Sequence, residues 1–238
     1  MMRELIIDGT NLLTTYGVWI AGNNVYNNAE ANVETVKVPG RNGDLVYSNR
    51  RYNNLTITYP AAIPANMTAR IEALRGFLYS NLGYRMIKDS YFPTMYRMGR
   101  ISGNINPTDI GWNNDSALFS ISFDCKPQHY LDSGLIETEY TTGATIANPT
   151  MFEALPLMRI YGYGTVTLNG TNVTVEENNY PWVDVDCEIQ DGYNGTTNLN
   201  MFLTVSGDRF PVLSPGSNTL TLGTGITKVA IKPKWWTL

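Results

Sequence analysis

The chain has 238 residues, a formal net charge of −4 and only 16% charged residues. This length suits either one large β domain or two domains of ordinary size. The negative charge argues against a protein that wraps phosphate backbones, because that binding needs clustered lysine and arginine. No apolar run approaches the length of a membrane span, so we do not expect a membrane protein.

The two cysteines, Cys125 and Cys187, are expected to remain reduced and to lie in different domains. Residues 1–4 show no signal-peptide pattern, and thiols stay reduced in proteins that are not secreted. Charged residues are fewer than in an average protein, and asparagine and threonine are common in their place. Such a composition suits a protein whose surface is largely covered by neighbouring chains.

Short strands separated by turn residues are predicted at the start of the chain. Residues 5–10 form one strand that ends in an Asp-Gly turn, because glycine accepts the positive φ that such a turn needs. Residues 18–20 form a second short strand. Nothing in this stretch has a helical spacing of apolar residues.

The next stretch predicts a β-hairpin. Residues 34–38 alternate strictly between apolar and polar, and a loop at 39–44 follows that is dense in proline, glycine and asparagine. Residues 45–47 and 55–59 then read as the two arms of the hairpin. Its polar tip is expected at 48–54.

One helix is predicted over residues 66–82. Its apolar residues are spaced three or four apart, which places them on one helical face. They are Met67, Ile71, Leu74, Leu78 and Leu82. Asn66 is expected to cap the helix at its start, and Gly83 to end it in a left-handed conformation. No other stretch shows a comparable period, so we expect a single helix laid against β-structure.

A long alternating strand is predicted at 117–126, after the helix. Phe119, Ile121 and Phe123 fall on one side of it together with Cys125. Four basic residues lie between the helix and this strand, and we expect them to pair with carboxylates or to face neighbouring chains rather than DNA. They are Arg85, Lys88, Arg97 and Arg100.

The second half of the chain has the pattern of a β-sandwich. Residues 166–175 alternate on both sides of Asn169-Gly170, which is a strong hairpin signal. Further short strands are predicted at the spacing of a sandwich. They cover residues 182–189, 202–205, 219–222 and 228–232. A polar connector at 135–150 is expected to link a first domain at 1–134 to a second at 151–238.

No catalytic residues are assigned. His129 is the only histidine, it follows a strand, and no Gly-x-Ser-x-Gly motif is present. We therefore interpret His129 as a partly exposed residue at a strand end. The sequence predicts a protein that is not an enzyme and that uses no cofactor.

An acidic row and a group of aromatic residues leave alternatives open. Asp184, Asp186 and Glu188 could ligate Ca²⁺ or act on a sugar, but the solvent face of a strand is favoured, and no metal site is assigned. Several aromatic residues could stack on sugar rings, although core or interface packing is favoured for them. They are Tyr161, Tyr163, Trp182, Trp235 and Trp236, of which the three tryptophans are the glycan-stacking alternative.

Several short motifs occur in an order that resembles one known family. The first is the loop 38–45, with Pro39, Gly40, Arg41, Gly43 and Asp44. The second runs from 88 to 97, with Asp89, Tyr91, Pro93 and Arg97. Others lie at 123–128, 148–149, 156–164, 210–216 and 233–236. Together they are similar to the distal tail (Dit) proteins of bacteriophages with long, non-contractile tails.

The resemblance implies a mainly β fold and a structural role in the virion. Members of that family have an N-terminal β-sandwich or split barrel with one α-helix, and a C-terminal galectin-like β-sandwich. They form a hexameric ring in the baseplate at the tail tip, assembled in the cytoplasm of the bacterial host. The motif residues named above are then expected to serve assembly.

The resemblance also implies partners. The ring joins the tail tube protein to a tail-associated, lysin-like hub protein, and it meets the tape measure and receptor-binding or baseplate proteins. DNA passes through a central channel without being bound, and no membrane is involved. A carbohydrate-binding β-sandwich module remains the alternative, although it gives no role to the first 130 or so residues.

Overall fold

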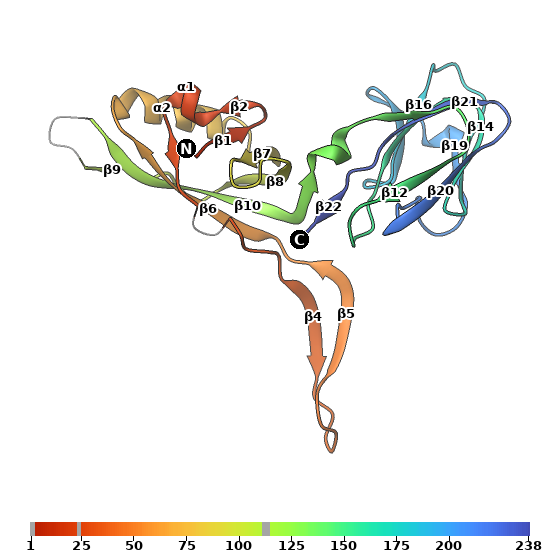
Figure 1. The fold of residues 1–238 in the computed structure, drawn as a ribbon, viewed down its shortest axis with the longest axis horizontal. Helices are drawn as coiled ribbons and strands as arrows, with labels where there is room; N and C mark the ends of the chain where they lie inside the picture. The colour runs from red at the N-terminus through yellow and green to blue at the C-terminus, as the bar shows by residue number, and fades with distance from the viewer. Residues whose placement is uncertain (1–2, 23–24, 111–114) are drawn as a thin grey trace. The chain divides into compact units, whose positions relative to one another are not determined.

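The computed structural model describes residues 3–22, 25–110 and 115–238, so Met1 and Met2 of the N-terminal segment lie outside the described residues. The chain is mainly β, as predicted, and it divides into two compact units (Figure 1). The first unit comprises the chain up to His129 together with Leu238, and the second comprises Tyr130–Thr237. Within the described residues, no helix is both long enough and apolar enough to cross a membrane.

The first unit is built on one antiparallel sheet with the order β2-β1-β7-β8-β10-β6-β3, and β9 also pairs with β10. Its strands are β1 (Leu5–Ile7), β2 (Thr10–Asn11), β3 (Trp19–Ile20), β6 (Leu55–Ile63), β7 (Arg85–Asp89), β8 (Met95–Ser102), β9 (Thr108–Asp109) and β10 (Ala117–Leu131). In β10, Phe119, Ile121 and Phe123 alternate inward, as the sequence predicted. Apolar residues of the sheet and of two helices pack together in one core.

Helix α2 (Met67–Tyr79) confirms the predicted helix, and Ile71, Leu74 and Leu78 are buried against the sheet. Its ends differ from the prediction. Leu82 lies beyond the helix and is 66% exposed, because the helix already ends at Tyr79. Asn66 has a left-handed backbone and makes no side-chain cap, while Ser80 rather than Gly83 occupies the C-cap.

A second helix, α1 (Leu12–Tyr16), was not predicted. It has five residues, too few for an apolar period to show in the sequence. Its signals are local. The Asn11 side chain accepts a hydrogen bond from the Leu13 N–H at 2.9 Å, and Gly17 ends the helix with a φ of 66°.

The hairpin forms between different strands from those predicted. β4 (Ala31–Val36) pairs with β5 (Leu45–Tyr52), so the loop between them is its tip, and 48–54 is not. Residues 55–59 belong instead to β6, which pairs with β10 along its length. Gly40 and Gly43 have φ angles of 80° and 81°, which explains why the chain reverses at this loop.

The second unit consists of two antiparallel sheets, which confirms the β-sandwich. The six-stranded sheet contains β11 (Thr138–Tyr140), β21 (Ile226–Lys232), β13 (Leu157–Gly162), β16 (Val183–Asp186), β17 (Asp191–Asn194) and β18 (Thr197–Asn198), in that order. The five-stranded sheet contains β12 (Ala144–Asn148), β20 (Gly216–Leu222), β14 (Gly164–Leu168), β15 (Thr171–Val175) and β19 (Leu203–Val205). Apolar residues of both sheets form one core.

Two details of this unit bear on the sequence predictions. The β14–β15 hairpin turns at Asn169 and Gly170, whose φ angles are 50° and 83°, as the Asn-Gly signal predicted. The stretch 135–150, expected as a linker, contains β11 and β12, which are edge strands of the two sheets. Its many polar residues reflect the exposed sides of edge strands.

Candidate functional site

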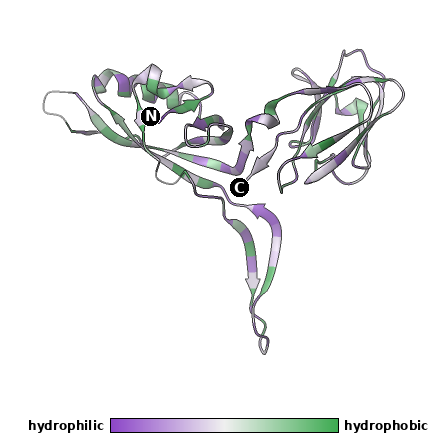
Figure 2. Cartoon of the chain, in the orientation of Figure 1, coloured by the Kyte–Doolittle hydropathy of each residue, from purple (hydrophilic) through white to green (hydrophobic). Residues whose placement is uncertain are grey.

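The β4–β5 hairpin forms a two-stranded sheet of its own within the described chain, and nearly all of its residues are exposed. Its apolar side chains define what we call the hairpin patch. They are Val33, Val36, Leu45, Val46 and Tyr47, and Tyr47 is 68% exposed. Figure 2 shows hydrophobic residues interspersed along the hairpin. Exposed apolar side chains gathered on one element indicate an interaction surface.

The register gives this patch two faces. Val36 and Leu45 lie directly opposite each other, and Tyr47 shares their face because it lies two residues along β5. Val33 and Val46 occupy the other face. A hairpin with apolar side chains on both faces can bury them only by packing against other surfaces on both sides. The large sheet of the first unit does not pack on the β4–β5 hairpin, whose residues are nearly all exposed.

The loop residues assigned to assembly lie at the tip of this hairpin. Pro39, Gly40, Arg41, Gly43 and Asp44 are all exposed. The Arg41 N–H donates to the Val38 carbonyl at 3.2 Å, which tightens the first half of the loop. Their role in the fold is therefore to turn the chain and hold the two strands in register.

The first unit also has an apolar groove, which is formed by residues far apart in the chain. Edge strand β3 contributes Trp19, β6 contributes Pro60 and Ala62, and β10 contributes Leu118. Trp19 and Leu118 are both nearly half exposed, and the groove encloses about 330 Å³. It is a second apolar surface on the first unit.

The motif around Asp89 has a structural role. Asp89 Oδ1 accepts the N–H groups of Tyr91 and Phe92 at 2.8 and 3.1 Å, and Oδ2 accepts the Tyr59 hydroxyl at 2.7 Å. Burial, followed by the neighbouring Asp89 charge, raises the pKa of Tyr59 well above its usual value. The Tyr91 hydroxyl in turn accepts the Gly22 N–H. The residues through Pro93 thus form a turn anchored to the core.

Arg97 and His129 are buried in the same unit. The Arg97 guanidinium contacts the Asn27 carbonyl at 3.5 Å, while its Nη1 atom has no hydrogen-bond partner, and burial lowers its pKa. His129 is only 5% exposed, so the expectation of a partly exposed histidine is wrong. Its ring packs edge-on against Phe92, with the ring centroids 4.9 Å apart. Burial, reinforced by the Arg97 charge, lowers the pKa of His129 to about 3.

The two cysteines are buried, and two of the four basic residues predicted to pair with carboxylates do so. Cys125 and Cys187 are free and buried in different units, and burial raises the pKa of each to about 12. Such thiols are poor nucleophiles near neutral pH. Arg85 pairs with Asp8 at 2.6 Å and Arg100 pairs with Asp124 at 2.9 Å, which confirms the predicted carboxylate pairing for these two.

The acidic row consists of Asp184 and Asp186 in β16 and Glu188 just after it, and all three carboxylates have basic partners. Asp184 is 4% exposed, and Arg159 binds it through two contacts of 2.7 and 3.0 Å, so it does not lie on a solvent face. The same pairing raises the pKa of Arg159. Lys234 contacts Asp186 at 3.1 Å and Glu188 at 3.2 Å. Within the described residues, no group of histidine, cysteine and carboxylate side chains gathers as a metal site.

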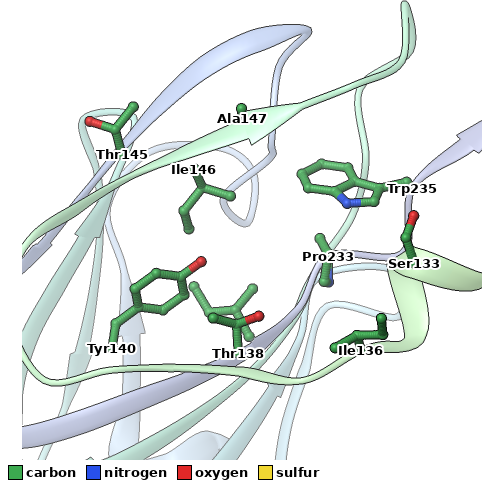
Figure 3. A pocket seen from close by; sticks show the side chains of 10 residues that line it. Ser133, Ile136, Thr138, Tyr140, Thr145, Ile146, Ala147, Pro233 and Trp235 are labelled. Atoms are coloured by element: carbon green, nitrogen blue, oxygen red, sulfur yellow. The ribbon is translucent and has the colours of Figure 1, made fainter.

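The three tryptophans have separate surroundings. Trp182 lies under the Arg159 guanidinium at 4.9 Å. Trp236 stacks on Phe152 at 4.4 Å and donates its indole N–H to the Glu153 carbonyl at 2.8 Å. Trp235 is buried in the sandwich core and forms one wall of a cavity of about 310 Å³ (Figure 3).

Solved structures of phage tail proteins share this fold. The Dit protein of phage SPP1, described as a paradigm of the hub adsorption apparatus in phages that infect Gram-positive bacteria, aligns over 97% of this chain and 98% of its own. The TM-score is 0.70 and the sequence identity 15%. The chain has a Dit-like fold. No protein-family model and no curated protein matches the sequence.

Chains of the phage P2 baseplate in its activated conformation have the Dit-like fold as well. The structure with Ca and the structure with Sr each give a TM-score of 0.60 over 97% of both chains, at 13% and 12% identity. Both units of the present chain are therefore covered by the likeness. At such identities the likeness establishes the fold and leaves the residues of any interface open.

Sequence reasoning missed the hairpin patch and the apolar groove. The alternation of β4 and β5 is visible in the sequence, but it does not tell whether the apolar side is buried or free. The groove brings together Trp19, Pro60 and Leu118, and only strand pairing reveals that these residues are neighbours.

Proposed function

We propose that the chain is a structural component of a phage or prophage tail tip, within the baseplate, and that it is not an enzyme. One observation carries the proposal: the Dit-like fold extends over 97% of the chain, and it includes a long hairpin with exposed apolar residues on both faces. A protein that acts alone in water rarely leaves such an element uncovered.

The chain forms a closed ring, for which six copies are the expectation set by the family resemblance. A ring needs two different complementary surfaces on every copy, because each copy contacts one neighbour with each surface. The first unit carries two apolar surfaces of this kind, the hairpin patch and the groove around Trp19 and Leu118. In the ring, the hairpin of one copy covers an apolar surface of the next.

The ring joins the tail tube protein to a tail-associated, lysin-like hub protein, with the tape measure and receptor-binding or baseplate proteins as further partners. DNA passes through its opening without being bound. The net charge of −4 supports this passive role, because a negatively charged wall repels duplex DNA. The complex is assembled in the cytoplasm of the bacterial host and resides at the tail tip of the virion.

Negative-stain electron microscopy of the purified full chain tests the proposal. We expect closed rings with a central opening, alone or after addition of the tail tube protein. Compact single particles at every concentration, with and without that partner, would contradict the ring. They would favour the alternative, a monomeric carbohydrate-binding module.

A further inference from the structure

The cavity in the second unit has a position and a lining that suit a small ligand. It opens between β11 and β12, which are the free edges of the two sheets, and it reaches the apolar core of the sandwich. Its volume of about 310 Å³ lies at the lower end of the range of roughly 300–1,000 Å³ found for small-molecule sites. A single ring with its substituents suits this size.

The lining is apolar on one side and carries hydroxyl groups on the other. Ile146, Ile231 and Trp235 belong to the sandwich core and form the apolar side. Figure 3 shows Tyr140 and Thr138 pointing into the same space, with Ser133 at one end. Burial raises the pKa of Tyr140 above its usual value. Hydroxyl groups both donate and accept hydrogen bonds.

Among the residues that the structure describes, no charged side chain lines the cavity. The two lysines of β21 are paired with carboxylates: Lys228 with Glu139 of β11 at 2.6 Å, and Lys232 with Glu137, just before β11, at 3.3 Å. An anion or a cation would lose its water shell here without an opposite charge to replace it, which is costly. The lining therefore selects for a neutral ligand.

The geometry points to a binding site for a neutral sugar ring in this cavity. A pyranose has an apolar face of C–H groups, which packs on Ile231 and Trp235, and hydroxyl groups on its edge, which meet Tyr140 and Thr138. Aromatic and aliphatic walls combined with a few hydroxyl groups are the usual composition of a small-molecule pocket. Of the three tryptophans that were candidates for glycan contact, this site uses Trp235. The inference concerns the second unit and does not depend on ring formation.

The test is a binding titration on the full chain, by calorimetry and saturation-transfer NMR. D-Glucose, D-galactose, N-acetyl-D-glucosamine and L-rhamnose are the neutral probes, and D-glucuronate is the acidic comparison. We expect saturable binding of at least one neutral sugar with a Kd of roughly 0.1–10 mM, the weak range that a few hydrogen bonds support. Glucuronate should bind at least about fivefold more weakly, since its carboxylate finds no cation in the lining.

Two variants place the sugar in the cavity. Tyr140→Phe keeps the ring and removes the hydroxyl, and Thr138→Val keeps the shape and removes the other hydroxyl. Each should weaken sugar binding at least about fivefold, because a hydrogen bond to the sugar is lost. Tyr163→Phe is the matched control, since Tyr163 is exposed and lies outside the lining. Thermal melts of all three confirm that they fold.

The inference is overturned by several results. One is the absence of saturable binding for every neutral probe up to about 50 mM, well above the expected Kd. Another is binding that Tyr140→Phe and Thr138→Val leave unchanged, which would place the sugar elsewhere. Tighter binding of glucuronate than of the neutral sugars would also overturn it. None of these results bears on the mass of the assembly, so the two proposals fail separately.

Discussion

Asp89 shows at the scale of one residue how a sequence motif becomes structure. Its carboxylate holds the turn at Tyr91 and Phe92 and accepts the hydroxyl of the buried Tyr59. The motif was identified from its order in the chain, and the structure supplies a physical reason for the aspartate. An amide or a shorter side chain would leave at least one of these donors without an acceptor.

We expect Asp89→Ala to lower the free energy of unfolding by roughly 2–4 kcal/mol, because buried donors lose their acceptor. Urea melts of the purified chain measure the change. The exposed Asp208 provides the control, and Asp208→Ala should stay within about 0.5 kcal/mol of the parent chain. Equal losses for the two variants would show that the Asp89 contacts contribute no stability.

His129 predicts a pH dependence of stability. Its pKa is lowered to about 3 in the folded chain, against 6.5 in the unfolded chain, so between these values the unfolded chain binds the additional proton. Stability therefore falls as the pH drops below 6.5, by up to about 1.4 kcal/mol per pH unit from this residue. Carboxylates add their own pH dependence, so a variant is needed to isolate the histidine.

His129→Gln should remove this contribution, since glutamine does not titrate in this range. Urea melts at pH 7 and at about pH 5 give the change in stability for each chain. We expect a smaller loss between the two pH values for His129→Gln than for the parent chain. An identical loss in both would show that His129 is protonated as readily in the folded state as in the unfolded one.

At the scale of elements, the sequence predicted those helices and turns that depend on interactions between residues close in the chain. The spacing of Ile71, Leu74 and Leu78 predicted α2, and Asn169-Gly170 predicted the β14–β15 turn, because both depend on residues close in sequence. Strand partners depend on the whole chain. The arm at 45–47 was therefore joined to the wrong strand, since the turn residues at 48–54 were as suitable for a tip as those at 39–44.

The candidate surfaces were predictable only in part, for the same reason. The residues of the hairpin tip were identified from their order in the chain, but the exposure of Tyr47 and Val46 depends on the absence of a covering layer. Asp184 was expected in solvent because its strand alternates. The structure instead places Arg159 over it, a contact between residues 25 positions apart.

Helix α2 allows a direct test of the buried face. Leu74 is fully buried, so Leu74→Ala should lower the free energy of unfolding by about 2–5 kcal/mol through lost burial and the cavity left behind. Glu72 lies on the exposed face, and Glu72→Ala should change the free energy of unfolding by less than about 0.5 kcal/mol. Denaturant melts measure the loss of stability in each variant. Similar losses in Leu74→Ala and Glu72→Ala would mean that the helix packs through another face.

At the scale of the whole molecule, each unit has its own core, and the Dit-like fold covers both. The exposed hairpin belongs to the first unit, and the hydroxyl-lined cavity belongs to the second. Assembly and ligand binding are thus proposed for different parts of the chain. The low fraction of charged residues agrees with a protein whose surface is shared with neighbours.

The proposed passive channel predicts that the purified protein does not retain duplex DNA near physiological salt. Arg85 and Arg100 are paired within the chain and Arg97 is buried, so these residues offer few cations for phosphates. Filter binding over a range of salt concentrations measures this. Retention of DNA at micromolar protein, with the steep salt dependence of phosphate contacts, would mean that the protein binds the DNA phosphates and would contradict the passive channel.

The mass of the particle in solution tests the central claim most directly. Light scattering of the full chain should give roughly six times the chain mass of 26.6 kDa, as a closed ring of six copies requires. Replacing Val46 and Tyr47 of the hairpin patch with glutamate should reduce the particle to single chains with little loss of folding, because both side chains are exposed. The same replacement of the exposed Tyr163, in the second unit, should leave the mass unchanged. A parent chain that remains monomeric at every concentration, and also when mixed with the tail tube protein, would contradict the account.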